Sequence, residues 1–408
     1  MKPLQGVRIL DFTQYTSGPI ATVLLADLGA EVIKLENPPY GDSNYYNAPS
    51  VNKHNSFIAS LDHNKKSVLL NVRDEKQKTL FLEMVKHADA VVDNFKTGTM
   101  KKLGIDFDVL SKINPRIVCA SISGYGQDGP WAKRAAYDII VQAVGGLMSV
   151  TGEKNGRALK GGFSLADIST GASCLPAILA GLLQARRTGR GCAIDCSMMD
   201  CAASILMEQI AYYGVTKENP DRMGNESQRL VPYGTYECRD GRMVMLCIHS
   251  DSEFAQLCNA LGAEEWKNHP AFRTMQARLE KRETVNHAVS EKLANWESKE
   301  LVQKLLSHGI CCALVQNVHE TDESEQLKVR NMTNALVQWP DGTQIRTVGC
   351  PIKISGVEDN ENRLGPSIGA DTLQVLSEFV PMEAIHEAYD DVLSDSRLKV
   401  QERSSKMK

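Results

Sequence analysis

The first 126 residues alternate between short apolar runs, which are typical of strands, and longer amphipathic runs, which are typical of helices. The strand-like runs are VRILDF, EVIKLE, SVLLNV, AVVDNF and RIVCASISGYG, and the helix-like runs include IATVLLADLGA and EKQKTLFLEMVKHA. Parallel strands need a crossover connection, which a helix usually provides. The alternation therefore predicts an α/β fold with a parallel sheet covered by helices.

The pattern changes after about residue 225. Residues 233–249 predict two strands around an Asp240-Gly241 turn, and charged helical runs follow. Because one hydrophobic core rarely grows beyond ~250–300 residues, we expect two domains. The predicted parts are a large α/β domain starting with residues 1–200, a linker helix over 201–225, a small α+β domain over 226–315, and a return linker with the C-terminal part of the large domain over 316–408.

Charge and composition restrict the partners. The chain has 46 Lys and Arg against 50 Asp and Glu, a formal net charge of -4, so it has no general attraction for nucleic acid or anionic membranes. The start MKPLQGVRILDF lacks the apolar core of a signal peptide, and no uninterrupted apolar run approaches ~18 residues. We expect a cytoplasmic protein that binds neither nucleic acid nor membranes, and that meets anionic ligands with local basic groups.

Several common functional motifs are missing from the sequence. No G-x-G-x-x-G follows the first strand-like run, and the chain has no G-x-x-x-x-G-K-[ST], H-E-x-x-H or G-x-S-x-G. The 11 cysteines are an odd number and form no C-x-x-C pair, which argues against disulfides and structural zinc. We therefore expect no metal site and no tightly bound cofactor.

One carboxylate draws attention in the segment GGFSLADISTG, residues 161–171. Asp167 lies among small and apolar residues, where a long run with helical spacing begins. In one interpretation it accepts backbone N–H bonds in the first turn and complements the helix dipole. In the other it is a nucleophile, because a carboxylate with an ordinary pKa near ~4 is ionised at neutral pH and needs no adjacent base. The pattern by itself leaves both interpretations open.

A set of ordered blocks resembles the family III (CaiB/BaiF-type) coenzyme-A transferases. The blocks are GVRILDFTQYTSGP, NKKSVLLNV, VDNFKTGTMKKLGIDF, AAYDII, ADISTG, TGRGCAIDCSMMDCA and YGTYECRDG. They cover most of the chain and are densest over residues 4–235. The resemblance implies a Rossmann-like large domain built from both termini, a smaller central α+β domain, and a homodimer whose two subunits interlock.

The same resemblance implies a reaction. The aspartate that matches Asp167 attacks an acyl-CoA thioester and forms an aspartyl–acyl anhydride, which the released CoA thiolate converts to an aspartyl-CoA thioester. A free carboxylic acid then takes over the coenzyme. Covalent catalysis divides one difficult exchange into steps with good leaving groups. The implied partners are acyl-CoA and a small carboxylic acid, with coenzyme A as substrate.

The resemblance also implies coenzyme contacts along the chain. These are Thr16, Ser17, Leu70, Arg73, Asn94, Phe95, Lys96, Lys102, Arg134 and Tyr137. Lys102 stands where many members have arginine, so it keeps the charge but loses the bidentate geometry. Without the resemblance, Arg73 and Lys102 would be assigned to a solvated surface and Tyr137 to packing.

Two alternative functions remain. A 2-methylacyl-CoA racemase of the same superfamily uses a histidine in an A-G-H-D segment, which reads Ala135-Ala136-Tyr137-Asp138 here. A phenol, with an ordinary pKa near ~10, suits proton exchange at neutral pH poorly. The other alternative is a non-catalytic CoA-binding protein.

The segment Gly224–Gln228 matches a G-N-x-H-P pattern of the family, but its His and Pro are missing here. The nearby Arg229 is either a partner for a second carboxylate of the substrate or a surface residue.

Overall fold

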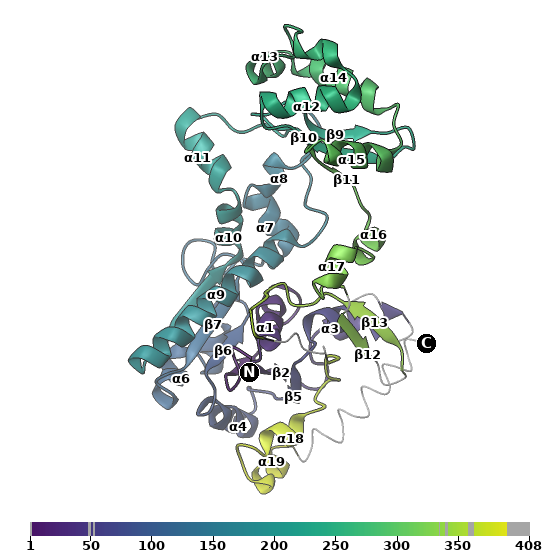
Figure 1. Cartoon of the computed structure of the whole chain (residues 1–408). Helices are drawn as coiled ribbons and strands as arrows, with labels where there is room; N and C mark the ends of the chain where they lie inside the picture. Colours follow the sequence, from purple (N-terminus) through teal and green to yellow (C-terminus); the bar gives the residue numbers. More distant parts are fainter. Residues whose placement is uncertain are drawn as a thin grey trace. The chain divides into compact units, whose positions relative to one another are not determined.

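The predicted parallel sheet is present in the computed structural model, which describes residues 2–47, 50–51, 54–333, 335–338, 342–357 and 363–389. The chain divides into two compact units (Figure 1). Unit 1 consists of Met1–Leu147, Gly161–Val215 and Glu325–Lys408, and unit 2 consists of Met148–Lys160 and Thr216–Ser324. Each unit has its own hydrophobic core.

Unit 1 is built on a six-stranded parallel sheet with the order β5-β2-β1-β6-β7-β8. Its strands are β1 (Arg8–Asp11), β2 (Glu31–Glu36), β5 (Lys66–Leu69), β6 (Ala90–Asp93), β7 (Val118–Ser123) and β8 (Ala193–Ser197). The chain runs outward from β1 to β5 and then returns to the other side of β1 with β6. This reversal gives the Rossmann strand order, in which ligands bind at the carboxyl ends of the strands beside the reversal.

Helices cover both faces of this sheet. On one face α1 (Ser17–Asp27) and α9 (Leu165–Thr188) pack over Ile9 and Val118. On the other face α4 (Glu75–Val85) and α6 (Phe107–Ile113) pack over Leu10. Because successive strand residues point to opposite faces, strands buried on both sides must be apolar at nearly every position. That requirement explains the continuous apolar runs in the sequence.

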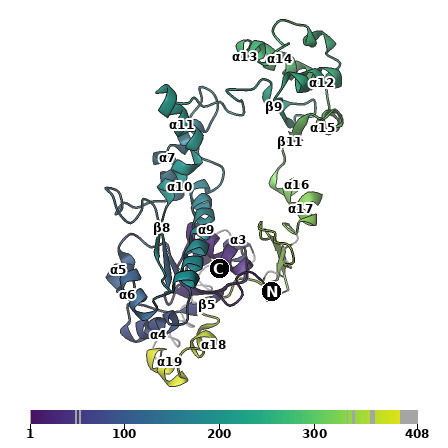
Figure 2. The same cartoon turned by 60° about the vertical axis from the view of Figure 1, so that its left-hand side comes forward.

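The C-terminal helices of unit 1 complete the second face. These helices, α18 (Thr372–Leu376) and α19 (Met382–Tyr389), lie at the same end of unit 1 as α4 in both views (Figures 1 and 2). The Leu69 amide donates a hydrogen bond to Thr372 Oγ1 at 3.0 Å, and the Tyr389 hydroxyl donates one to the Leu69 carbonyl. Residues from both ends of the chain therefore form one unit, and the predicted mixed α/β fold is confirmed.

The remaining elements of unit 1 are short. They are α2 (Asn44–Asn47), β3 (Ser50–Val51), β4 (His54–Asn55), α3 (Ser56–Leu61), α5 (Thr99–Leu103), α7 (Asp138–Val144), α10 (Met198–Ile205), α11 (Met207–Thr216), α17 (Glu325–Val329), β12 (Ala335–Gln338) and β13 (Gln344–Thr347). The strands pair as β3-β4 and β12-β13, both antiparallel. A single turn of helix, α8 (Leu147–Val150), lies at the boundary with unit 2.

Unit 2 is an α+β unit around a three-stranded antiparallel sheet with the order β11-β10-β9. The predicted hairpin is confirmed, with Val244 paired to Tyr236 and the turn at Gly241, whose φ is 73°. The elements are β9 (Tyr233–Glu237), β10 (Met243–Cys247), α12 (Asp251–Leu261), the 3-10 helix η1 (Glu264–Lys267), α13 (Met275–Glu280), α14 (Arg282–Leu293), α15 (Ser298–Ser307), β11 (Cys311–Leu314) and α16 (Val318–Asp322).

The bounds of unit 2 differ from the predicted small domain over 226–315. Residues 148–160, which the sequence analysis placed in the large domain, belong to unit 2. Hydrogen bonds tie this segment to the one before β9, since Gly224 N donates to Gly152 O at 3.0 Å and Arg222 Nη2 donates to Gly156 O at 2.8 Å. Over the range of the predicted linker helix, 201–225, the structure has α10 and α11, which end at Thr216.

In the part of the chain that the structure describes, one helix, α9, is long and apolar enough by length and composition to cross a membrane. No uninterrupted apolar run marks it in the sequence, because serines, threonines and glycines lie between its apolar residues. The inner face of α9 belongs to the core beside the sheet, through residues such as Cys174 and Ile178. Its outer face leaves Ile168 and Leu183 exposed.

Candidate active site

The carboxyl ends of the parallel strands bring several predicted site residues to one edge of the sheet. Thr16 and Ser17 follow β1, and Asn94 follows β6, the strand on the other side of the reversal. The two loops are joined, because Gln14 N donates to Asn94 Oδ1 at 2.9 Å and Asn94 Nδ2 donates to Gln14 O at 2.7 Å. Phe95 packs against Phe12, with ring centroids 5.8 Å apart. This edge is the expected ligand crevice of an open α/β sheet.

Asp167 lies at the same edge. The helix that carries it, α9, runs from the carboxyl edge back to the start of β8, so its first turn must lie where the strands end. Helices α1 and α9 cross closely there, because a Cβ added at Gly171 would lie 2.6 Å from the Ser17 carbonyl oxygen and 2.7 Å from Ile20 Cβ. Glycine is therefore required at this crossing, which sets the start of α1 against the first turns of α9.

The Asp167 carboxyl group is half-buried and has a perturbed pKa. Burial raises this pKa, the negative charge of Asp138 raises it further, and a hydrogen bond from the buried Ser17 hydroxyl opposes both, which leaves it at about 7. Among the described residues, no lysine or arginine forms an ion pair with Asp167. The side chain is therefore about half ionised near neutral pH, and an anion with few hydrogen bonds is a reactive one.

The N-terminus of α9 is capped by a different aspartate. Asp138, from α7, accepts the N–H of Ala166 at 2.8 Å and the N–H of Asp167 at 3.2 Å, both with Oδ1. The residue at the N-cap position, Ser164, makes no capping bond with its side chain. The helix-cap role that the sequence left open for Asp167 is therefore filled by Asp138, and among the described residues no backbone N–H donates to the Asp167 carboxylate.

Other predicted contacts lie on the surface. Arg73, Lys96 and Lys102 are exposed, and no described contact links Arg73 or Lys102 to Asp167. The Arg134 guanidinium lies over the Trp131 ring, 4.2 Å from its centroid, and Tyr137 is 68% exposed directly before Asp138.

Leu70 is only 2% exposed and belongs to the core of unit 1. Its side chain packs with the apolar residues of that core, and its amide donates a hydrogen bond to the Glu36 carbonyl at 2.8 Å. The Leu70 side chain is therefore not accessible to a ligand in this structure.

Sequence reasoning missed a buried group of charges beside the same edge, which we call the lysine cluster. It comprises Lys34, Lys65, Asp11, Asp42 and Asp62, each at most 6% exposed. Lys34 Nζ lies 2.9 Å from carboxylate oxygens of both Asp42 and Asp62, and Lys65 Nζ lies 3.1 Å from those of Asp11 and Asp62. Asp11 Oδ1 also accepts the Thr13 N–H at 2.8 Å, so the cluster anchors the loop that leads to Ser17.

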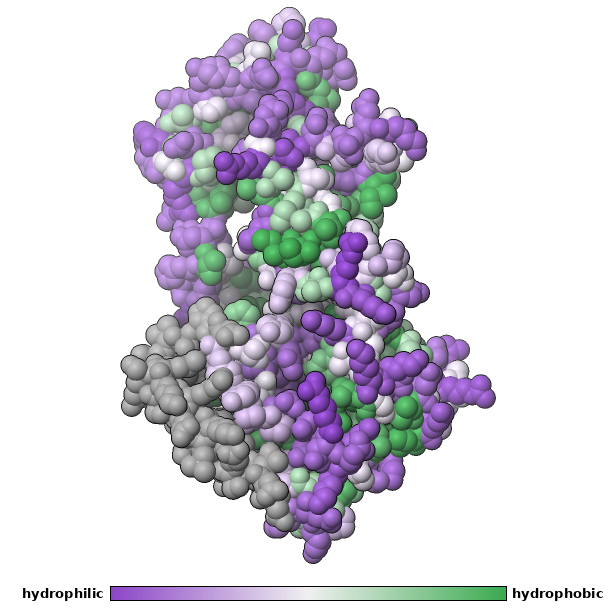
Figure 3. Space-filling model, turned by 180° about the vertical axis from the view of Figure 1, so that it is seen from behind, coloured by the Kyte–Doolittle hydropathy of each residue, from purple (hydrophilic) through white to green (hydrophobic). Residues whose placement is uncertain are grey.

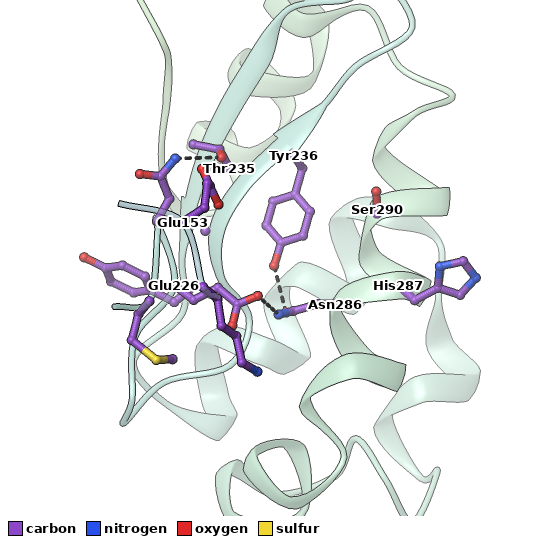
Figure 4. Close-up of a pocket in the computed structure, with 12 residues that line it drawn as sticks. Glu153, Glu226, Thr235, Tyr236, Asn286, His287 and Ser290 are labelled. Atoms are coloured by element: carbon purple, nitrogen blue, oxygen red, sulfur yellow. Dashed lines mark hydrogen bonds between the residues drawn. The ribbon is translucent and has the colours of Figure 1, made fainter. Parts of the chain in front are cut away.

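Unit 2 contains a polar cavity of about 400 Å³. Tyr236 on β9 and Glu226 in the segment before β9 both point toward Asn286 on α14 (Figure 4). The Tyr236 hydroxyl donates to Asn286 Oδ1 at 3.0 Å, and Asn286 Nδ2 donates to Glu226 Oε1 at 3.3 Å. Arg229 is exposed and is not among the lining residues. The cavity includes part of the Gly224–Gln228 segment and none of the predicted coenzyme contacts.

A metal centre has no candidate in the part of the chain that the structure describes. Within those residues, no group of three or more His, Cys, Asp or Glu side chains is arranged to hold a metal ion.

Comparison with known proteins gives one consistent family. A family model described as CoA-transferase family III matches residues 4–372. The chain is 33% identical to the acetyl-CoA:oxalate CoA-transferase of Acetobacter aceti, over 94% of this chain and 97% of that protein. It is 32% identical to the succinate–glutarate CoA-transferase of Agrobacterium fabrum, over 93% and 96%. The crystal structure of a CaiB/BaiF family protein from Brucella suis, 30% identical, matches with a TM-score of 0.84 and covers 93% of this chain and 100% of that one.

Proposed function

Because this chain belongs to CoA-transferase family III and is a CoA-transferase, we propose that it transfers the coenzyme through covalent intermediates on Asp167. The observation that carries the proposal is the state of this carboxylate. It lies at the ligand-binding edge of the sheet, it is half-buried, and Asp138 has taken the backbone N–H groups that would otherwise hold it. Such a carboxylate is available as a nucleophile.

The proposed reaction has two halves. In each half, one C–S bond and one C–O bond break, and one bond of each kind forms. The Asp167 carboxylate attacks the thioester carbonyl, the C–S bond breaks, and the CoA thiolate leaves with the electron pair. The thiolate attacks the aspartyl carbonyl of the anhydride and releases the donor acid as a carboxylate. The acceptor carboxylate then attacks the aspartyl-CoA thioester, and the released thiolate attacks the acceptor's acyl carbon, which frees Asp167. No proton, metal or redox step is needed in this sequence, which explains why a lone carboxylate suffices.

We place the coenzyme at the β1/β6 reversal. Thr16, Ser17 and Asn94 line the joined loops there, and α5, which carries Lys102, begins shortly after β6. The exposed cations Arg73, Lys96, Lys102 and Arg134 supply the local positive charge that phosphate groups need in a protein of net charge -4. Coenzyme A is a substrate here, and we expect no tightly bound cofactor.

The substrates are proposed to be short carboxylic acids and their CoA thioesters. The relatives named above act on acetyl-CoA with oxalate and on succinate with glutarate, and both pairs are small acids. A family member with similar full-length coverage is expected to use the same class. The expectation of a cytoplasmic enzyme that works without nucleic acid or a membrane remains a prediction.

A homodimer is proposed from the apolar surface of unit 1. Large apolar side chains are exposed on several of its helices, namely Ile139, Ile140 and Val144 on α7, Ile168 and Leu183 on α9, Ile205 on α10, and Met207 and Ile210 on α11. Figure 3 shows patches of apolar surface on one face of the molecule. Exposed apolar surface of this extent is typical of protein–protein contacts, and a second copy of the chain is the partner that the family resemblance implies.

The proposal is tested by coenzyme exchange. Purified enzyme is incubated with a panel of acyl-CoA donors and mixed free acids, and new acyl-CoA species are identified by mass spectrometry. We expect one short-chain pair to exchange with the wild-type enzyme and no pair to exchange with Asp167→Asn. Full exchange by Asp167→Asn would reject Asp167 as the nucleophile. Deuterium uptake at the α-carbon of a 2-methylacyl-CoA without any acceptor acid favours the racemase, and CoA binding without exchange favours the non-catalytic alternative.

A further inference from the structure

The N-terminal cap of α9 comes from a distant part of the chain, whereas two other helices are capped locally. Helices α4 and α12 are capped by the residue directly before them, Asp74 and Ser250. In the first turn of α9, the N–H groups instead donate to Asp138. This residue precedes the two residues that donate to it by 28 and 29 positions. A local cap by Asp167 itself would tie up the carboxylate in backbone hydrogen bonds.

We propose that Asp138 is a positioning residue, which caps α9 in place of Asp167 so that the Asp167 carboxylate stays free to attack, and which sets the pH range of that attack by its charge. The proposal rests on the proposed role of Asp167 as the nucleophile. It assigns Asp138 no contact with the reacting atoms, because both of its oxygens are already engaged within the protein.

The second oxygen of Asp138 is held by a buried glutamine. Gln142, which is 1% exposed, donates from Nε2 to Asp138 Oδ2 at 2.6 Å. Its Oε1 accepts the Gly161 N–H at 2.8 Å. Gln142 therefore fixes the Asp138 rotamer and also connects it to the segment that leads into α9. This chain of hydrogen bonds explains how a residue on α7 can orient the first turn of another helix.

The charge of Asp138 acts on the same carboxyl group. Among the described residues, the groups that act on the charge of Asp167 are Asp138 from α7 and the Ser17 hydroxyl from α1. After burial, the Asp138 charge is the larger cause of the raised pKa of Asp167, which is about 7. A more basic carboxylate is a stronger nucleophile, and a pKa near the working pH keeps a useful fraction of it ionised. Attack requires the ionised form, so activity rises with pH through this value.

Two substitutions at Asp138 separate its two roles. Asp138→Asn keeps an oxygen that can accept the α9 N–H groups but removes the charge and the acceptor for Gln142 Nε2, a loss that Gln142→Met reproduces on its own. Asp138→Ala removes the charge and both acceptors. The readout is the pH dependence of kcat/KM, which reports groups of the free enzyme. In Asp138→Asn we expect the acidic limb, near pH 7 in the wild type, to move down by about one pH unit, the usual scale of a single charged neighbour. In Asp138→Ala we expect a loss of kcat at every pH.

Matched controls keep the test specific. Asp74→Asn makes the same change at the cap of α4, where Asp74 accepts the N–H groups of Lys76 and Gln77, and should leave the limb in place. Gln142→Met keeps the charge of Asp138 but releases its rotamer, so we expect a lower kcat with an unmoved limb. This variant also keeps the proposal testable if Asp138→Asn does not fold.

The proposal is overturned if Asp138→Asn leaves the acidic limb where it is, or if Gln142→Met leaves kcat unchanged. Failure of the proposed function has a different signature. In that case Asp167→Asn retains coenzyme exchange, whatever the Asp138 variants do. If Asp167→Asn is inactive and the Asp138→Asn limb does not move, only the positioning role is rejected.

Discussion

Two groups of carboxylates lie near the same edge of the sheet in unit 1, and they are held in opposite ways. In the lysine cluster, Asp62 is fully enclosed, yet Lys34 and Lys65 more than offset the effect of burial and hold its pKa below the ordinary value. At the start of α9, burial and a second carboxylate, Asp138, raise the pKa of Asp167 to about 7. The carboxylates of the first group are paired with lysines inside the protein, so their role is structural. The second has no cation partner among the described residues, and this is the state expected of a group that reacts.

The difference shows how the fold separates stability from reactivity. A buried charge without a partner is costly, so charges inside a protein are normally paired and hydrogen-bonded. The lysine cluster follows that rule and fixes the loop between Asp11 and Ser17. Asp167 breaks the rule where the loop meets α9. Changes to each group should therefore have different effects on stability and activity.

The largest effect on stability is expected from Lys34→Met. This change removes the cation between Asp42 and Asp62. Asp42 then loses its lysine and Asp62 keeps only Lys65, which should lower the free energy of unfolding by about 3–5 kcal/mol. Urea unfolding at pH 7.5 measures it. The control is Lys66→Met on the neighbouring strand, whose partly exposed ion pair with Glu31 should be worth less than about 1 kcal/mol. Equal losses in the two variants would show that the lysine cluster stabilises the fold no more than a partly exposed ion pair does.

A smaller loss of stability is expected from Gly171→Ala, which disturbs the surroundings of Asp167 and not the lysine cluster. The new methyl group would meet the Ser17 carbonyl and Ile20, so α1 must move away from the first turns of α9, at a cost of about 1–3 kcal/mol. Coenzyme exchange should fall together with stability, because Ser17 moves relative to Asp167. Gly162→Ala is the control, since nothing lies within 4 Å of the added carbon. Normal exchange by Gly171→Ala would contradict the importance of this close crossing.

An effect of opposite sign is expected from Asp167→Asn, which should stabilise the protein at alkaline pH. The pKa of Asp167 is about 7 in the folded state and ~3.9 in the unfolded chain, so the folded state binds the extra proton between these values. Wild-type stability therefore falls as pH rises from about 4 to about 7, and the variant lacks this fall. We expect the variant to gain about 1–2 kcal/mol at pH 8 and almost nothing at pH 4, as measured by chemical unfolding. A variant that is less stable than the wild type at pH 8 would place Asp167 among the structural carboxylates.

The smallest effect is expected from Lys102→Ala and concerns the affinity for CoA. Lys102 lies on the surface, unlike the buried lysines of the lysine cluster. If it meets a phosphate of the coenzyme, its removal should weaken CoA binding by about 1 kcal/mol, roughly fivefold in Kd, as measured by calorimetry. The adjacent and equally exposed Lys101 provides the matched control, Lys101→Ala. Unchanged affinity in Lys102→Ala would remove this residue from the coenzyme site.

The sequence predicts the local elements well because their signals are local. The alternating runs predict the parallel sheet, and Asp240-Gly241 predicts the hairpin of unit 2, since each depends on a few adjacent residues. Asp167 could be selected from its small neighbours and from the family resemblance. Its environment could not, because the cap comes from Asp138 and the neighbouring hydroxyl from Ser17, both distant in the chain.

The buried charges were hidden for a related reason. Lys34 stands at an alternate position of the strand EVIKLE, where a lysine normally indicates a solvent-facing side chain. Its partners, Asp42 and Asp62, are 8 and 28 residues away and reach it only in the folded unit. Residues 148–160 likewise carry no pattern that assigns them to unit 2, because hydrogen bonds to Arg222 and Gly224 make that connection.

The central claim, that the Asp167 carboxylate carries the acyl group and then the coenzyme, is tested most directly by trapping. Enzyme is incubated with its acyl-CoA donor and hydroxylamine, digested, and analysed by peptide mass spectrometry. The account predicts a hydroxamate at Asp167, with loss of activity that depends on the donor. A hydroxamate on any other residue, or an unmodified Asp167 in an enzyme that continues to exchange coenzyme, would contradict it.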